Sequence, residues 1–208
     1  MSYLLLLIVL SALLHITGLY VKSPSLKMVF KPLTTGLIIY LAFRQNGDTV
    51  SAYKTLIITG LIFSLMGDVF LMLPRERFIA GLVSFLVAHL FFITAFTLHG
   101  GPFWNWFYLA PVVVYFGLLS NILLKHTGKM TLPVVVYSLV ILFFAWQAGG
   151  RYDFAPSTQT AYGFLGAVLF VFSDSLLAYN KFVKPLRWAP AGIMVLYWGA
   201  LVFLTLSI

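Results

Sequence analysis

Apolar residues in this chain fall into eight long runs separated by short polar connections. A helix needs about 20 mostly apolar residues to cross the hydrocarbon core of a bilayer. The pattern therefore predicts an all-α, polytopic membrane protein with eight transmembrane helices. No connection is long enough for a soluble domain, so we expect a single transmembrane domain over residues 1–208. The predicted spans are Tyr3–Val21, Val29–Phe43, Tyr53–Leu73, Phe78–Leu98, Phe103–Leu124, Thr131–Gln147, Thr158–Ala178 and Trp188–Leu206.

The composition excludes a water-soluble fold. Only 9% of the residues are charged and 62% are hydrophobic, with a mean hydropathy of +1.02, whereas a soluble domain is about 25% charged. A net charge of +8 would suggest nucleic acid in a soluble protein. Here the basic residues lie between apolar runs, so we expect them to face lipid headgroups and expect no nucleic-acid partner. The lack of cysteine excludes thiolate nucleophiles and cysteine-based metal sites.

Basic residues also predict the orientation of the spans. The connections after spans one, three, five and seven, with their flanks, are far more basic than those after spans two, four and six. The positive-inside rule places the first group in the cytoplasm and both termini on the opposite side. The first group holds Lys22, Lys27, Lys31, Arg75, Arg77, Lys125, Lys129, Lys181, Lys184 and Arg187, and the second Arg44, Lys54 and Arg151.

Two aspartates lie inside predicted spans, Asp68 in span three and Asp174 in span seven. A carboxylate in hydrocarbon costs a few kcal/mol and marks a functional-site hypothesis. Both fall in the cytoplasmic third of the membrane in the predicted orientation. Spans three and seven occupy equivalent places in two four-span halves. The repeated motif is thus compatible with two parallel four-helix halves related by an axis along the membrane normal, which would bring the two carboxylates to one site.

The aspartate pair has a catalytic and a structural interpretation. Two neighbouring carboxylates in a low dielectric cannot both ionise easily, so one can donate a proton while the other acts as base or electrostatic partner. Alternatively, each aspartate bonds a neighbouring hydroxyl, amide or Lys31 and only fixes helix packing. The sequence leaves both interpretations open.

Seven other polar residues are candidates for substrate binding. Lys31 is either a snorkelling interfacial lysine or a phosphate contact and counter-charge. His89 is either a packed core histidine or part of the site, and it lacks the second histidine of a metal-binding pair. Arg75 and Arg77 either bind a lipid phosphate or simply follow the positive-inside rule. The seven candidates are Lys31, Arg75, Arg77, His89, Asn180, Tyr40 and Ser64.

Several short motifs together resemble one known family, the YhhN-type lysoplasmalogenases. The layout of eight short spans in about 200 residues resembles it as well. The motifs are Phe30-Lys31-Pro32, Gly67-Asp68-Val69-Phe70-Leu71 leading into Leu73-Pro74-Arg75, Phe78-x-x-Gly81-x-x-Ser84-Phe85-x-x-x-His89, and Phe172-Ser173-Asp174.

The resemblance implies hydrolysis of the vinyl ether bond of lysoplasmalogens, giving a fatty aldehyde and glycerophosphoethanolamine or glycerophosphocholine. One aspartate would protonate the vinyl ether and the other would stabilise the resulting cation and activate water, without a metal or redox cofactor. The partners would be a lysophospholipid and the bilayer, in a bacterial inner membrane, and a homo-oligomer is compatible with the sequence. The alternative function is a proton-coupled transporter of a small or lipid-like solute, and a third is a structural or partner-binding membrane protein.

Overall fold

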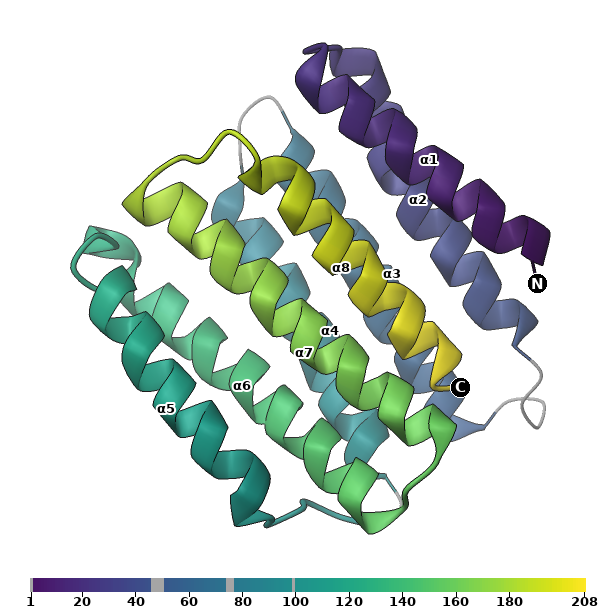
Figure 1. The fold of residues 1–208 in the computed structure, drawn as a ribbon, viewed down its shortest axis with the longest axis vertical. Helices are drawn as coiled ribbons and strands as arrows, with labels where there is room; N and C mark the ends of the chain where they lie inside the picture. The colour runs from purple at the N-terminus through teal and green to yellow at the C-terminus, as the bar shows by residue number, and fades with distance from the viewer. Residues whose placement is uncertain (1, 46–50, 74–76, 99) are drawn as a thin grey trace.

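The computed structural model describes residues 2–45, 51–73, 77–98 and 100–208, and these residues form an all-helical bundle (Figure 1). Eight of the helices in this part of the chain are long and apolar enough to cross a membrane, which confirms the predicted fold class. They are α1 (Ser2–Tyr20), α2 (Pro24–Arg44), α3 (Ala52–Met72), α4 (Phe78–Thr97), α5 (Trp106–Leu123), α6 (Thr131–Phe154), α7 (Thr158–Ala178) and α8 (Ala189–Leu206). Two short segments complete the list, a 3₁₀ turn η1 (Gly128–Met130) and a π-helical turn η2 (Tyr179–Val183).

Most predicted span boundaries lie within three residues of the observed ones, and two differ by five residues or more. Helix α2 begins at Pro24, five residues before the predicted start, because Ser23 caps it and the helix continues through the basic residue Lys27. Helix α6 continues beyond the predicted end at Gln147, through Gly149 and Gly150 to Phe154. A Cβ atom at Gly149 would lie 2.4 Å from the ring of Tyr108. Glycine therefore permits close packing of α6 against α5, rather than ending the helix.

The two halves of the chain pack in matching ways. Helix α3 packs against α4, and the equivalent helix α7 packs against α8. Helix α2 contacts α8 of the other half, and the equivalent helix α6 contacts α4. The helices α1 and α5 lie at opposite edges of the bundle, each against the next helix of its own half (Figure 1). This arrangement supports two parallel four-helix halves, with α3 and α7 in equivalent central places.

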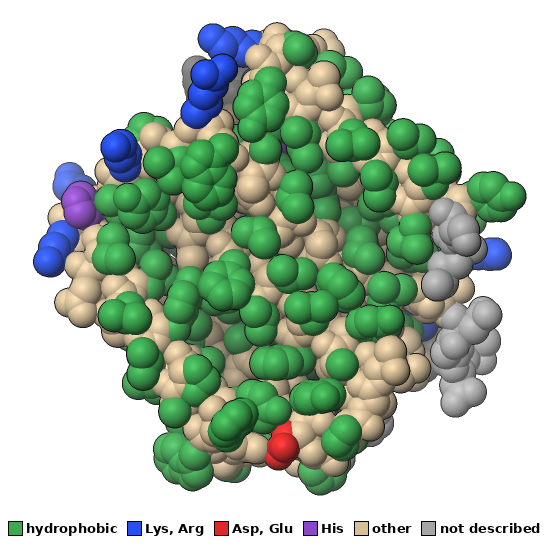
Figure 2. Space-filling model, in the orientation of Figure 1, with side chains coloured by type: hydrophobic (Ala, Val, Ile, Leu, Met, Phe, Trp, Pro, Cys, Tyr) green, Lys and Arg blue, Asp and Glu red, His purple; other side chains and the backbone are tan. Residues whose placement is uncertain are grey.

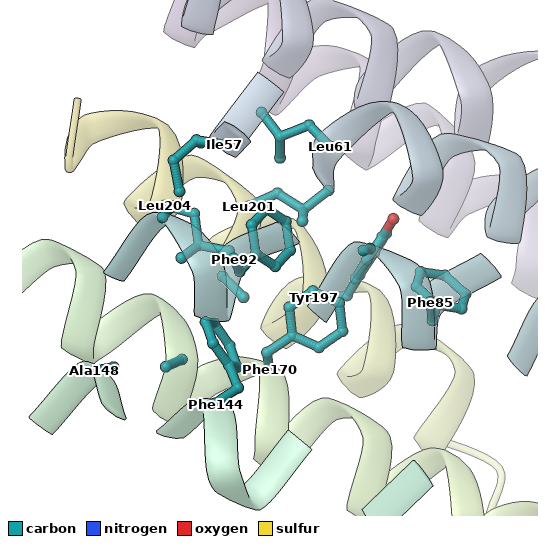
Figure 3. Close-up of a cluster of buried hydrophobic side chains, with 14 of the residues drawn as sticks. Ile57, Leu61, Phe85, Phe92, Phe144, Ala148, Phe170, Tyr197, Leu201 and Leu204 are labelled. Atoms are coloured by element: carbon teal, nitrogen blue, oxygen red, sulfur yellow. The ribbon is translucent and has the colours of Figure 1, made fainter. Parts of the chain in front are cut away.

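Large aromatic and aliphatic side chains fill the centre of the bundle. Phe92 of α4, Phe144 of α6 and Phe170 of α7 are fully buried and meet Leu201 and Leu204 of α8 (Figure 3). This core lies between the two central helix pairs, so it fixes α3 and α7 relative to each other. The positions of the two aspartates are therefore set by rigid elements.

The outer surface is apolar, as a helix bundle in lipid requires. Figure 2 shows hydrophobic side chains over most of one face, including the area of α7 and α8. The lysines and arginines visible there lie mainly at the end of the bundle that carries the α1–α2, α5–α6 and α7–α8 connections (Figures 1 and 2). The described part of the chain is thus that of an integral membrane protein with one basic end.

Candidate active site

A cavity of about 510 Å³ lies between helices α1, α2, α3, α4, α7 and α8. Its wall contains both predicted aspartates, Asp68 from α3 and Asp174 from α7. The two aspartates are about a hundred residues apart in the chain, and the structure brings them to one cavity, as the predicted relation between the two halves would. The polar residues that line this cavity are His15, Lys27, Lys31, Asp68, Ser173, Asp174, Asn180 and Tyr197.

Asp68 is almost fully buried, with 1% of its surface exposed, and it is surrounded by donors. The Nζ atom of Lys31 lies 3.1 Å from its Oδ1 atom. The hydroxyls of Thr35 and Tyr197 donate to its Oδ2 atom, at 2.7 and 2.9 Å. The oxygen of Thr35 also accepts the indole N–H of Trp198 at 3.2 Å, which directs the Thr35 proton towards the aspartate. Two hydroxyl donors and one cation suit an ionised carboxylate, which only accepts hydrogen bonds.

Asp174 has a simpler environment. It is partly exposed to the cavity, and its Oδ2 atom accepts a hydrogen bond from the hydroxyl of Tyr137. Among the residues that the structure describes, no lysine or arginine forms an ion pair with Asp174. Hydrogen bonds on both sides fix this part of α7, because Ser173 donates to the carbonyl of Ile193 at 3.1 Å and Tyr115 donates to Ser175 at 2.6 Å. The second carboxylate is therefore well positioned but lacks a cationic partner in the described chain.

Two of the seven other candidates line the cavity. Lys31 is 7% exposed and forms the ion pair with Asp68, so its role as counter-charge is visible in the structure. Asn180 lies in η2, where its side-chain oxygen accepts the backbone N–H of Leu186 at 2.7 Å. This bond ties the α7–α8 connection to the end of α7. Asn180 therefore shapes the basic end of the cavity.

Four other candidates are not brought to the cavity, or cannot be placed. The hydroxyl of Ser64 is buried and donates to Gly60 of its own helix at 3.0 Å. Tyr40 is 54% exposed, and it does not belong to the lining. Arg77 is exposed and also absent from the described lining. Arg75 lies outside the described residues.

His89 lies behind the site rather than in it. It is fully buried, and its Nδ1 atom is 2.7 Å from the carbonyl oxygen of Phe85, one turn earlier. Its ring packs against Phe170 and Tyr137, with ring centroids 4.5 and 5.6 Å apart. Since Tyr137 binds Asp174, the contact of His89 with the site is indirect.

The structure adds residues that the sequence did not single out. Tyr137 and Tyr197 bind one aspartate each, and a hydroxyl inside an apolar span is a signal, because it needs a partner when buried. Thr35 follows Lys31 by one helical turn and so shares its face. Lys27 and His15 also line the cavity, and the Nδ1 atom of His15 lies 3.2 Å from the carbonyl oxygen of Lys27.

Comparisons with known proteins agree with this picture. The model of the YhhN family matches residues 26–208. The human protein Lysoplasmalogenase TMEM86B is 31% identical over 155 residues, which cover 74% of this chain and 64% of the human protein. The mouse protein of the same name is 35% identical over 150 residues, which cover 71% of this chain and 60% of the mouse protein. The membrane protein YhhN of Shigella flexneri is 28% identical over 165 residues, covering 79% of this chain and 78% of that protein. This chain thus spans less than two thirds of the length of these human and mouse relatives, and no solved structure matches it.

Proposed function

Because this chain belongs to the YhhN family, we propose that it is a membrane lysoplasmalogenase. Relatives named lysoplasmalogenase, at 31% and 35% identity, support this proposal. The cavity with two aspartates from α3 and α7 supports it independently. In the proposed reaction the enzyme consumes one water and splits the vinyl ether bond of a lysoplasmalogen. The products are a fatty aldehyde and glycerophosphoethanolamine or glycerophosphocholine.

The chemistry of a vinyl ether defines what the site must supply. A proton is added to the β-carbon of the double bond, and the ether oxygen stabilises the cation that forms on the α-carbon. Water then adds to the α-carbon and loses a proton, which gives a hemiacetal. The hemiacetal collapses to the aldehyde and the free alcohol of the glycerol. The site therefore needs an acid, a negative charge close to the cation and room for one water.

We assign the acid to Asp174 and the negative charge to Asp68. The observation that carries this assignment is the difference in their partners. Asp68 accepts hydrogen bonds from Thr35 and Tyr197 and pairs with Lys31, which stabilise its ionised form. Asp174 has no such cation among the described residues, so keeping a proton avoids the cost of an uncompensated charge in hydrocarbon. After it has given this proton to the β-carbon, Asp174 can take one from the attacking water, which restores the acid.

The polar headgroup would bind at the basic end of the same cavity. Lys27 and Lys31 lie one turn apart on α2 and both line the cavity, so a phosphate can contact both ammonium groups. A phosphate that shares the charge of Lys31 would leave more of the negative charge of Asp68 for the developing cation. We place this end in the cytoplasm, in a bacterial inner membrane with both termini outside. A lysolipid of the inner leaflet then has its vinyl ether near the two aspartates.

The test uses purified protein in liposomes and three substrates with the same hydrocarbon chain. A lysoplasmalogen should release fatty aldehyde, whereas the saturated alkyl-ether lysolipid should not react, because it has no double bond to protonate. An alkenyl glycerol without phosphate should react with a much higher KM, because it lacks the group that binds Lys27 and Lys31. If neither alkenyl substrate releases aldehyde, the proposal is contradicted. Uptake of a lipid-like solute that depends on a proton gradient, without any product, would favour the transporter instead.

A further inference from the structure

A second cavity begins on the other side of Asp174. It has a volume of about 50 Å³, and Asp174, Phe85 and Leu177 belong to the walls of both cavities. The first cavity contains two lysines, whereas the second is bounded largely by apolar residues of α4, α5, α6 and α7. The partly exposed aspartate is therefore the boundary between a cationic and an apolar space.

The apolar space continues away from the basic end of the bundle. A third cavity of about 210 Å³ shares Tyr115, Leu142 and Val171 with the second one. Along α7 the lining residues run from Leu177 through Val171 to Phe164. The lining residues of α5 and α6 shift towards the same end of the bundle. The fourteen residues from 164 to 177 correspond to roughly 20 Å of helix. We call the second and third cavities together the groove. The hydrocarbon of one bilayer leaflet is about 15 Å deep, so the groove is long enough for a single lipid chain.

The packing of α5 leaves this groove open towards the lipid. Helix α5 lies at the edge of the bundle, against α6 and η2 (Figure 1). Leu123 is its only buried residue in the described range. Its contacts with α7 include the hydrogen bond from Tyr115 to Ser175 and the ring contact of Tyr108 with Phe164, whose centroids are 5.5 Å apart. Phe172 of α7 lines the third cavity and is 49% exposed, so beside these contacts the cavity reaches the lipid-facing surface.

We propose that the groove between α5, α6 and α7 binds the alkenyl chain of the lysolipid, an inference that rests on the proposed function. The occupant follows from the polarity of the three neighbouring cavities, which share wall residues. The phosphate lies with Lys27 and Lys31, the chain lies in the apolar groove, and the bond between them passes Asp174, which has to reach the β-carbon. The groove length would then set the longest chain that binds well.

Two neighbouring valines of α5 provide a matched test. Val112 lines the groove, whereas Val113 is 57% exposed on the outer surface. In Val112→Trp the indole should fill the groove, so the ratio of kcat/KM for a long-chain to a short-chain lysoplasmalogen should fall roughly tenfold, the equivalent of about two methylenes losing their apolar site. Val113→Trp should leave the ratio unchanged. Equal ratios in the two variants, or equal losses for both chain lengths in a folded Val112→Trp protein, would overturn the proposal.

A second measurement uses the unmodified protein. A non-hydrolysable alkyl-ether lysolipid with a photoreactive diazirine at the end of its chain should label the walls of the groove near Tyr108 and Phe164. Labelling of α1, α2 or α8 instead would show that the chain leaves through the first cavity, and would overturn the proposal. The labelling result does not depend on whether the protein hydrolyses lysoplasmalogens. Wild-type protein that hydrolyses neither chain length would refute the function, and the labelling would still locate the chain.

Discussion

The two aspartates occupy equivalent places in the two halves of the bundle, yet their surroundings differ. In the first half, α2 offers Lys31 and Thr35 to Asp68. In the second half, the corresponding helix α6 offers only the hydroxyl of Tyr137 to Asp174. The same backbone arrangement therefore surrounds one carboxylate with compensating donors and leaves the other open to the cavity. A nearly symmetric scaffold can in this way supply an acid and a charged group from one residue type.

The largest effect should come from removing the proposed acid. Asp174→Asn cannot protonate the vinyl ether, so we expect aldehyde release to fall by about 10²–10⁴-fold, the usual contribution of general acid–base catalysis. Initial rates with a lysoplasmalogen in liposomes measure this loss. Because Asp174 has no ion pair in the described chain, thermal unfolding in detergent should change little.

Asp153 provides the matched control for this substitution. It lies at the far end of α6, and its carboxylate accepts a hydrogen bond from Asn105 at 2.6 Å, away from the cavity. Asp153→Asn should retain the wild-type rate. Full turnover by folded Asp174→Asn protein would remove Asp174 from the chemistry.

The next largest effect concerns Asp68 and is measured as a change in the stability of the protein. Lys31→Met leaves the charge of the buried Asp68 without its cation, which typically costs about 3–5 kcal/mol of unfolding free energy. In the double variant Lys31→Met with Asp68→Asn no charge remains unpaired, so most of this loss should be recovered. Thermal or denaturant unfolding of the purified variants in detergent measures both effects. If the double variant is as unstable as Lys31→Met alone, the ion pair does not explain the burial of Asp68.

The sequence was sufficient to predict the eight spans and to single out both aspartates, because both predictions depend only on local properties of the chain. An apolar run needs only length, and a charge inside it stands out whatever surrounds it. The partners of the aspartates depend on the tertiary arrangement. Tyr40 and Tyr197 are similar in sequence context, yet Tyr40 is 54% exposed and Tyr197 binds Asp68. Hydropathy does not distinguish them, since tyrosine is tolerated in both places. The end of α6 was missed because Gly149 serves packing there rather than a turn.

The smallest effect comes from the two tyrosines and tests whether the number of donors decides the roles of the aspartates. Tyr137→Phe removes the hydrogen bond that stabilises Asp174 as it becomes a carboxylate in the transition state. A hydrogen bond to a charged group contributes about 1.5–3 kcal/mol, so kcat should fall roughly tenfold or more. Tyr197→Phe removes one of several donors to Asp68, so Thr35 and Lys31 should limit the loss to roughly a few-fold. Both variants keep the aromatic ring, and unfolding temperatures show whether packing is preserved. An equal or larger loss of kcat in Tyr197→Phe would mean that Asp68, in spite of its neutralising partners, is the carboxylate whose charge changes during the reaction.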